Sequence, residues 1–217
     1  MINKGIKFNN IHTYDDLNLI LSASEIPAAK PKTTYIEIPG ADGSLDLTEA
    51  NGEVKYEDRE LKFTFTFIPD EFTTFEEKRT EVVNVLNGKK CKVTLDRDED
   101  FYYYGRCSID SYKIDKNLHK IVVEVKAHPY KFKQNITNKA IELTGIPTTH
   151  KLANARKSVV PSITCTHDNT VVSFKNGTYK LSAGKHKILD ILFVEGNNEV
   201  TVSGSGTVTF EYQEGEL

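Results

Sequence analysis

The sequence predicts a mainly β protein of two domains, in which the first domain carries one helix and the second is an all-β sandwich. Three observations favour this fold class. Apolar and polar residues alternate in many short stretches, with the period of two that is typical of strands. Helical spacing occurs in a single stretch that ends at Leu86, and the composition changes near Phe132.

The change in composition divides the chain into residues 1–132 and 133–217. The first part holds 19 basic and 23 acidic residues, whereas the second holds 9 and 8 and is rich in Thr, Ser, Asn, Gly and Val. A length of 217 residues permits one large domain or two small ones. The shift in composition favours two domains that are joined by a short connection.

The clearest strand of the first domain lies at residues 61–68. Large apolar residues alternate there with Lys and Thr, so one face of the strand is apolar. That face consists of Leu61, Phe63, Phe65 and Phe67. Further strands are expected at residues 34–38, 92–95, 103–112 and 120–127, with turns at residues 39–43, 51–52 and 115–117.

One amphipathic helix is expected between Thr73 or Thr74, either of which can cap it, and Leu86. Two glutamates occupy its first turn, where the helix dipole favours negative charge, and an Asn-Gly pair at residues 87–88 ends it. The residues on its apolar face are Phe75, Val82 and Leu86. We therefore expect this helix to lie on a sheet.

The second domain contains only strand signals. Glycines separate short alternating segments, as the turns of a Greek-key sandwich require. The seven expected strands are residues 140–143, 162–166, 170–174, 178–181, 186–194, 199–203 and 207–212.

Charge and cysteine content exclude several classes of protein. The 28 basic and 31 acidic residues give a formal charge of -3, which provides no long-range attraction for nucleic acid or acidic membranes. The apolar runs are far shorter than a membrane span, and the N-terminus is too polar for a signal peptide, so we expect the protein to remain in solution. Three widely spaced cysteines favour synthesis in a reducing compartment, without a disulfide framework or a zinc site.

Motifs of catalysis are missing from the sequence. It has no nucleophile elbow and no glycine-rich phosphate loop, and its six histidines are all more than five residues apart. The acidic run at residues 96–100 lacks the Gly and the terminal Glu of a calcium loop, so we interpret it as a solvated hairpin tip. We therefore expect no catalytic residue, no metal and no cofactor.

The aromatic run at residues 101–104 permits three interpretations: a stacking surface for carbohydrate or bases, a part of the core, or a contact with another subunit. The acidic turn that precedes it argues against bases, because carboxylates repel phosphate. Alternation directs Phe101 and Tyr103 to one side of a strand and Tyr102 and Tyr104 to the other. One pair is expected in the core, and the outward pair remains available for contact.

Several strings occur in a recognisable order through the first domain. They are Ile-His-Thr-Tyr-Asp-Asp-Leu at 11–17 followed by the apolar residues 19–21, Ile-Pro-Gly-Ala-Asp-Gly-Ser-Leu-Asp-Leu at 38–47, Tyr-Glu-Asp-Arg-Glu-Leu at 56–61, Gly-Lys at 88–89, the segment 96–106, and Ala-His-Pro-Tyr at 127–130. Together they resemble the distal tail proteins of long, non-contractile-tailed bacteriophages or their prophage counterparts. The last third matches more weakly, and its Gly-Asn-Asn at 196–198 and its ending at 212–217 look like the galectin-like sandwich of that family.

The resemblance implies a tail-tube-like sandwich, flanked by a helix and a hairpin, at residues 1–132 and a galectin-like sandwich at residues 133–217. It also implies a homo-hexameric ring, single or as two rings back to back, at the virion tail tip, assembled in the bacterial host cytoplasm. The implied partners are the tail tube protein, a tail-associated lysin or tip protein, and a receptor-binding protein. DNA would pass through the channel without specific binding, which suits the mildly acidic first domain.

The ring that the resemblance implies needs a repeated contact between subunits. The segment from residue 39 to 47 and its continuation to residue 59 are long enough to reach a neighbour. The candidate assembly residues are Pro39, Gly40, Asp42, Gly43, Leu45 and Arg59, together with the outward aromatic residues Tyr102 and Tyr104.

Two other functions compete with this structural role. A carbohydrate-binding module would place host-surface sugar on the second domain, yet the chain has no Trp and that domain has only Tyr179 and Tyr212 for stacking. A tail-associated hydrolase would need a pair of carboxylates in a cleft. With 31 acidic residues some carboxylates will lie close together by chance, so surface charge is the simpler interpretation.

Overall fold

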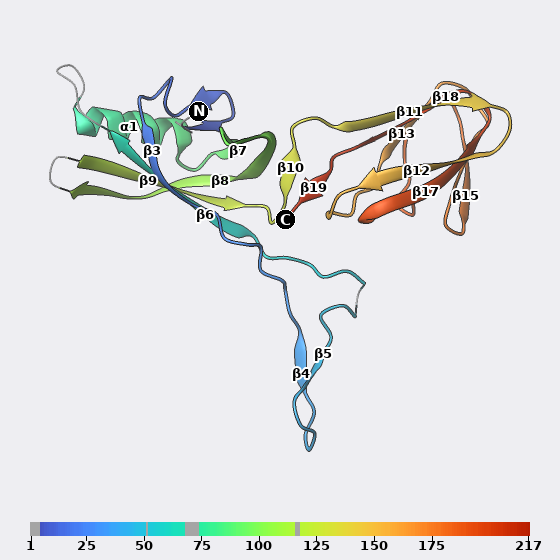
Figure 1. Ribbon diagram of the computed structural model, residues 1–217, viewed down its shortest axis with the longest axis horizontal. Helices are drawn as coiled ribbons and strands as arrows, with labels where there is room; N and C mark the ends of the chain where they lie inside the picture. The colour runs from blue at the N-terminus through green and yellow to red at the C-terminus, as the bar shows by residue number, and fades with distance from the viewer. Residues whose placement is uncertain (1–4, 51, 68–73, 116–117) are drawn as a thin grey trace. The chain divides into compact units, whose positions relative to one another are not determined.

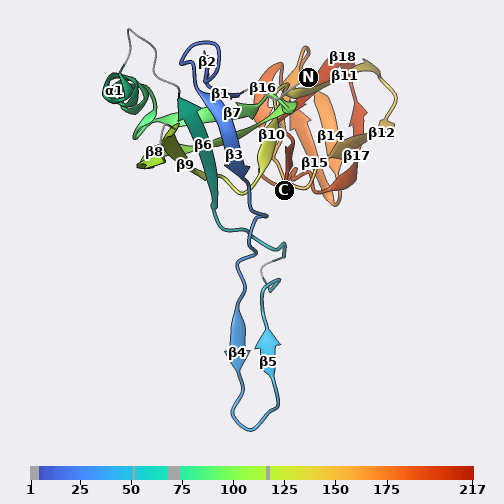
Figure 2. The same cartoon turned by 60° about the vertical axis from the view of Figure 1, so that its left-hand side comes forward.

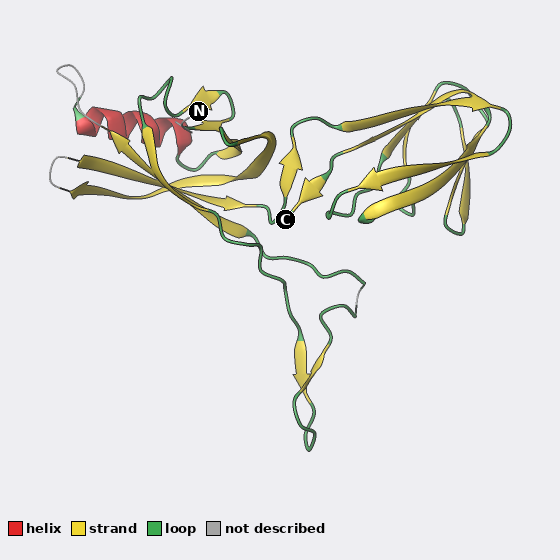
Figure 3. Ribbon diagram, in the orientation of Figure 1, coloured by secondary structure: helices red, strands yellow, loops and turns green. Residues whose placement is uncertain are grey.

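The computed structural model describes residues 5–50, 52–67, 74–115 and 118–217, and the chain forms two compact units, Met1–Lys131 and Phe132–Leu217 (Figure 1). Strands dominate both units, and α1 is the only helix in the described ranges (Figure 3). The predicted mainly β fold class is confirmed.

One antiparallel sheet forms the body of the first unit. Its strand order is β2-β1-β7-β8-β9-β6-β3. The long strand β8 pairs with β7 through its first part and with β9 through the rest, and its register shifts between Ile109 and Ser111. The bounds are β1 Ile6–Phe8, β2 Ile11–His12, β3 Ile20–Glu25, β6 Arg59–Phe67, β7 Lys90–Leu95, β8 Asp98–Asp115 and β9 Leu118–Ala127.

This sheet curls into two layers around one core. Along the sheet β1 and β6 are separated by three strands. Nevertheless the ring of Phe8 on β1 lies 6.3 Å from that of Phe63 and 6.5 Å from that of Phe65, both on β6. The contacts are possible only because the sheet turns back on itself, so the two layers of the expected sandwich belong to one continuous sheet.

Strand β6 confirms the predicted alternation. Its four odd-numbered apolar side chains, Leu61, Phe63, Phe65 and Phe67, are at most 1 % exposed, whereas the residues between them are only half-buried. Complete burial of a large apolar side chain contributes about 1.5–3 kcal/mol. This strand is therefore the centre of the core in the first unit.

Helix α1 spans Phe75–Leu86 and confirms the predicted helix. Thr74 is its cap: the Glu77 amide donates to the Thr74 hydroxyl over 3.3 Å, and the Thr74 amide donates to the Glu77 carboxylate over 2.9 Å. The alternative cap, Thr73, lies outside the described residues. Gly88 follows the helix with a φ of 75°, which ends it as predicted. The expected apolar face is buried.

A separate two-stranded sheet lies between β3 and β6 in the chain. It consists of β4 Tyr35–Glu37 and β5 Ser44–Asp46, which pair only with each other. The predicted strand at residues 34–38 and turn at 39–43 are confirmed, since Gly40 and Gly43 adopt φ of 81° and 74°. The predicted turn at 51–52 includes Asn51, and that at 115–117 includes residues 116–117; these three residues lie outside the described ones.

The second unit is a β-sandwich, as predicted. One sheet has the order β11-β18-β13-β16 and the other β12-β17-β14-β15. The bounds are β11 Thr137–Thr144, β12 Thr148–Asn154, β13 Ser162–Cys165, β14 Thr170–Phe174, β15 Gly177–Leu181, β16 Gly184–Lys187, β17 Gly196–Ser203 and β18 Ser205–Tyr212. The short strands β10 Lys131–Lys133 and β19 Gly215–Glu216 complete the described set.

Eight strands differ from the sequence-based expectation. In the first unit no strand was expected at β1, β2, β3 or β5, whose patterns are short or mostly exposed. The short strands β10 and β19 were not expected either. In the second unit β12 was also missed, because its sequence is largely polar. The strand expected at residues 186–194 ends at Lys187, since Ile191 and Phe193 reach the core from a loop in which the Ile191 amide donates to the Ile188 carbonyl over 3.1 Å.

Phe193 organises the core of the second unit. Its ring lies 5.7 Å from that of Phe174, 6.2 Å from that of Phe210 and 5.2 Å from that of Tyr212. The loop that carries it is held by Asn198, which is 4 % exposed. The Asn198 side chain accepts from the Val194 amide over 2.9 Å and donates to the Val194 carbonyl over 2.9 Å and to the Leu152 carbonyl over 3.3 Å.

All three cysteines, Cys91, Cys107 and Cys165, are free and buried. Burial raises the pKa of the Cys107 thiol well above its usual range, and the neighbouring Cys91 adds to the effect. Burial also raises the pKa of Cys165. Because the thiolate is the reactive form, these side chains act as small apolar core residues.

Replacing Asn198 with Ala should lower the free energy of unfolding of the second unit by about 1–3 kcal/mol, because it leaves buried backbone groups without partners. The neighbouring Asn197 is exposed, and Asn197→Ala should change stability by less than about 0.5 kcal/mol. Urea denaturation of the full-length variants measures both effects. Equal losses in the two variants would contradict the structural role of Asn198.

Candidate interaction surface

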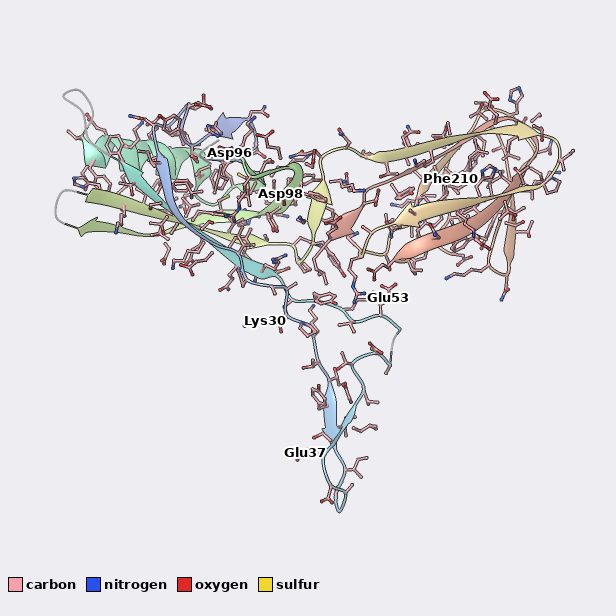
Figure 4. All side chains as sticks on the ribbon, viewed as in Figure 1. Lys30, Glu37, Glu53, Asp96, Asp98 and Phe210 are labelled. Carbon is pink, nitrogen blue, oxygen red and sulfur yellow. The ribbon has the colours of Figure 1, made fainter. Side chains whose placement is uncertain are left out.

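Residues 30–57, here called the arm, connect β3 to β6 and project from the sheet of the first unit (Figures 1 and 2). The base of the arm is closed by two backbone hydrogen bonds: the Glu57 amide donates to the Lys30 carbonyl over 2.9 Å, and the Lys32 amide donates to the Lys55 carbonyl over 2.7 Å. Lys30 and Glu53 mark this base in Figure 4, and Glu37 lies farther out.

The outer half of the arm is a regular hairpin. Tyr35 is opposite Asp46, Ile36 is opposite Leu45, and Glu37 is opposite Ser44. Three hydrogen bonds to the carboxylate lower the pKa of Asp46, and the bond from the Thr48 hydroxyl has the largest effect. The other two come from the Thr48 amide, over 2.9 Å, and from the Tyr35 hydroxyl. Asp46 therefore remains ionised at neutral pH.

Apolar side chains of this hairpin face solvent. Every residue from 31 to 46 is exposed, so neither face of the β4–β5 hairpin is covered by the rest of the unit. The large apolar side chains are Tyr35 at 59 %, Ile36 at 47 %, Ile38 at 48 % and Leu45 at 49 % exposure. An isolated two-stranded hairpin is marginally stable in water, and grouped exposed apolar residues are typical of contact surfaces. The arm is thus a candidate binding element.

The outer part of the arm is also strongly acidic. Residues 33–50 contain four acidic residues and no Lys or Arg. The acidic residues are Glu37, Asp42, Asp46 and Glu49, and all four are exposed. A partner surface should therefore be basic as well as partly apolar.

A second surface lies on the outward side of β7, β8 and β9. Alternation along β7 and β8 buries Cys91, Val93, Tyr103 and Cys107 and directs the intervening side chains outward. Strand pairing brings Lys90 beside Arg106, Lys92 beside Tyr104, and Arg106 beside Lys126. We call this surface the basic face, and it consists of Lys90, Lys92, Tyr102, Tyr104, Arg106 and Lys126.

The basic face combines positive charge with aromatic rings. The Lys92 ammonium lies 4.5 Å from the centre of the Tyr102 ring, and Tyr104 is 43 % exposed. Carboxylates border the face: Asp58 lies 3.9 Å from the Lys126 ammonium, and Glu60 is paired with Lys126 across the strands. Glu124, two residues before Lys126 on β9, lies 2.9 Å from the Lys62 ammonium, and Asp100 precedes Tyr102 by two residues on β8. Within the face itself every charged side chain is a cation.

The structure places most of the candidate assembly residues on these two surfaces. Pro39, Gly40, Asp42, Gly43 and Leu45 are exposed on the arm. In the aromatic run Tyr103 is the buried member, Tyr104 is exposed and Tyr102 is half-buried.

Arg59, the remaining candidate assembly residue, lies on neither of these surfaces. Its side chain is 7 % exposed and is engaged within its own unit. The guanidinium donates from Nε to the Pro27 carbonyl over 2.9 Å and from Nη1 to the Pro129 carbonyl over 3.2 Å, and it lies 5.3 Å from the centre of the Tyr103 ring. Arg59 therefore anchors the base of the arm to the sheet.

Only the first two residues of the acidic run at 96–100 form the predicted hairpin tip between β7 and β8, since residues 98–100 belong to β8, and part of the run is engaged within the unit (Figure 4). Asp96 accepts from the Gly5 amide over 2.9 Å and lies 3.0 Å from Nε2 of His12. Asp98 accepts from the Lys131 ammonium over 3.0 Å. Within the described ranges there is no group of three or more His, Cys, Asp or Glu side chains that could hold a metal ion.

The four cations of the basic face were not predicted from the sequence. The Lys-Cys-Lys order at residues 90–92 hints at an outward pair, but only the pairing of three strands unites it with Arg106 and Lys126. No helix in the described part of the chain is long and apolar enough to cross a membrane.

Comparisons with known proteins give one family and one related fold. The family model described as the phage tail protein RIFT-related domain matches residues 10–144. The crystal structure of the SPP1 Dit protein (gp 19.1), described as a paradigm of the hub adsorption apparatus in phages that infect Gram-positive bacteria, superposes with a TM-score of 0.70. The two chains are 15 % identical, and the superposition covers 96 % of this chain and 98 % of the other. No curated protein matches the sequence.

Replacing Arg59 with Met keeps an aliphatic stem but removes the donors to Pro27 and Pro129. We expect Arg59→Met to lower the free energy of unfolding of the first unit by about 1–3 kcal/mol, since two carbonyls lose a charged partner. Glu60→Ala, at the exposed neighbouring position, should change it by less than about 0.5 kcal/mol. Thermal and urea denaturation compare the two variants, and an unaltered Arg59→Met stability would refute the anchoring role.

Proposed function

The chain belongs to the family of phage tail proteins with a RIFT-related domain, and from this membership we propose that it is the structural hub at the tip of a phage tail. In this proposal six copies form a ring that joins the tail tube to the baseplate or host-adsorption device. The protein acts by assembly and geometry, without catalysing a reaction.

The exposed arm is the observation that carries the proposal. It presents four large apolar side chains to solvent on a hairpin that contributes none of the described core residues of its own unit. Such a segment gains stability when another molecule covers it. A contact between the arm of one copy and a different surface of the next copy is heterologous. Repeating such a contact generates a closed ring when the rotation between successive copies adds up to a full turn.

The two units take different roles in the proposal. The first, which contains the arm and most of the family match, forms the ring; the second, a galectin-like sandwich, is attached to it. The similarity of the fold to SPP1 Dit, described as a hub, supports this reading. The proposed partners are the tail tube protein above the ring and a tail-associated lysin or tip protein and a receptor-binding protein below it.

The charge of the first part of the chain supports passage of DNA through the ring. Residues 1–132 hold 19 basic and 23 acidic residues, so they provide no net attraction for phosphate. In the proposal DNA passes through the channel without specific binding. The ring forms in the host cytoplasm and remains in the virion at the tail tip.

The alternative function, carbohydrate binding by the second unit, is not favoured. Tyr212 is 3 % exposed and its hydroxyl donates to the Ala153 carbonyl over 2.6 Å. The Tyr179 side chain is half-buried, with its hydroxyl 3.2 Å from the Asp190 carboxylate. Neither tyrosine of this unit therefore presents a fully open ring on which a sugar could stack.

Native mass spectrometry tests the assembly. The intact protein should form species of six copies or, for two rings back to back, twelve. Replacing residues 33–54 with Asn-Gly removes the outer arm at the hydrogen-bonded pair Lys32 and Lys55, where a two-residue turn fits. This variant should remain folded by circular dichroism, because the core is unchanged, and be monomeric.

Two outcomes would contradict the proposal. One is an intact protein that remains monomeric up to the highest concentration reached, both alone and with its tail partners. The other is an arm-deleted protein that still forms six copies, because the arm would then not provide the ring contact.

A further inference from the structure

The arm and the basic face are complementary surfaces on the same unit. We propose that the arm of one copy docks on the basic face of a second copy. The inference rests on the proposed ring and deepens it, since it identifies the surface that receives the arm.

Charge supports this pairing. The outer arm carries four carboxylates and no cation, whereas the six residues of the basic face include four cations and no carboxylate, with Asp58, Glu60, Asp100 and Glu124 at the border. Opposite charges in contact attract each other more strongly at a protein surface than in bulk water, because the effective dielectric constant is lower there. Several such pairs align two molecules and exclude surfaces of the wrong sign.

Apolar contact supports it as well. The arm presents Tyr35, Ile36, Ile38 and Leu45, and the basic face presents the ring of Tyr104 beside the aliphatic stems of its lysines. Tyrosine rings bury a large area while keeping a polar group, which suits a contact with both apolar and charged parts. The two surfaces therefore agree in polarity and in charge.

The partner must be a different copy, because a chain does not cover its own basic face. Residues 31–46 of the arm are exposed, and so are Lys90, Lys92, Tyr104, Arg106 and Lys126. Each copy thus offers one arm and one face. When two copies dock, one arm and one face stay open for further copies, which is the arrangement that a closed ring requires.

Charge reversal tests the pairing. The first variant carries Glu37→Lys and Asp42→Lys on the arm, and the second carries Lys90→Glu and Lys92→Glu on the basic face; all four positions are exposed. Each variant reverses two of the four charges on one surface, which cancels the net charge of that surface and removes the net attraction between arm and face, so the association constant should fall at least about tenfold by sedimentation equilibrium. Glu142→Lys and Lys180→Glu, exposed in the second unit, are the matched controls and should associate as the parent does.

Mixing the two variants provides the decisive test. The lysines introduced on the arm of the first variant then meet the glutamates introduced on the face of the second, and the unchanged acidic arm of the second variant meets the unchanged basic face of the first. The mixture should regain association within about threefold of the parent, in rings in which the two variants alternate. Native mass spectrometry should find them in equal numbers.

A cross-link in the otherwise unchanged chain gives a second readout that does not depend on charge. Ile36→p-benzoylphenylalanine should attach, on illumination of the assembled protein, to a peptide from residues 89–106 of another copy. Attachment elsewhere, or reversal variants that associate like the parent, would overturn this inference and leave the proposed ring intact. A parent protein that does not self-associate at all would overturn the proposed function and this inference together.

Discussion

The burial of one face of β6 is the constraint on which the rest of the first unit depends. Its apolar side chains fill the space between the two layers of the curled sheet, and a shift of one residue would move all of them to the solvent side. The register of β6 therefore determines where the strand begins. Because the arm ends where β6 begins, and the Arg59 guanidinium donates to the carbonyls of Pro27 and Pro129, the core also fixes the base of the arm.

The arm itself has no comparable support. Beyond its base, backbone pairing and a few local side-chain bonds hold it, and its large side chains lie in solvent. Exposed apolar residues of this kind are typical of contact surfaces. The fold thus separates two tasks: the curled sheet supplies stability and carries the basic face, and the arm extends away from the sheet. This division suits a tail protein of the family to which the chain belongs.

Local patterns predicted the parts of the fold whose signals are themselves local. The alternation in β6, the cap and stop of α1 and the turn at Gly40 each depend on a few consecutive residues. Strands β1, β2, β3 and β12 were missed because tertiary pairing holds them, and Phe193 was assigned to a strand because a buried loop residue has the same apolar character. The burial of Arg59 was not predicted for a related reason, since its partner Pro129 is distant in sequence. The basic face could not be predicted, because the pairing register of three strands brings its residues together and the composition does not reveal that register.

The proposed contact also reconciles two requirements of the proposed ring, through which DNA would pass. Four cations beside tyrosine rings form the kind of surface that attracts single-stranded or duplex nucleic acid, and an uncovered basic face would work against free passage. If the acidic arm of a neighbour lies on that face, its carboxylates neutralise the cations and its apolar residues cover the rings. The interaction that closes the ring would then remove the feature of the isolated subunit most prone to bind the genome. On this reasoning assembly and inertness toward DNA follow from the same pairing of charges.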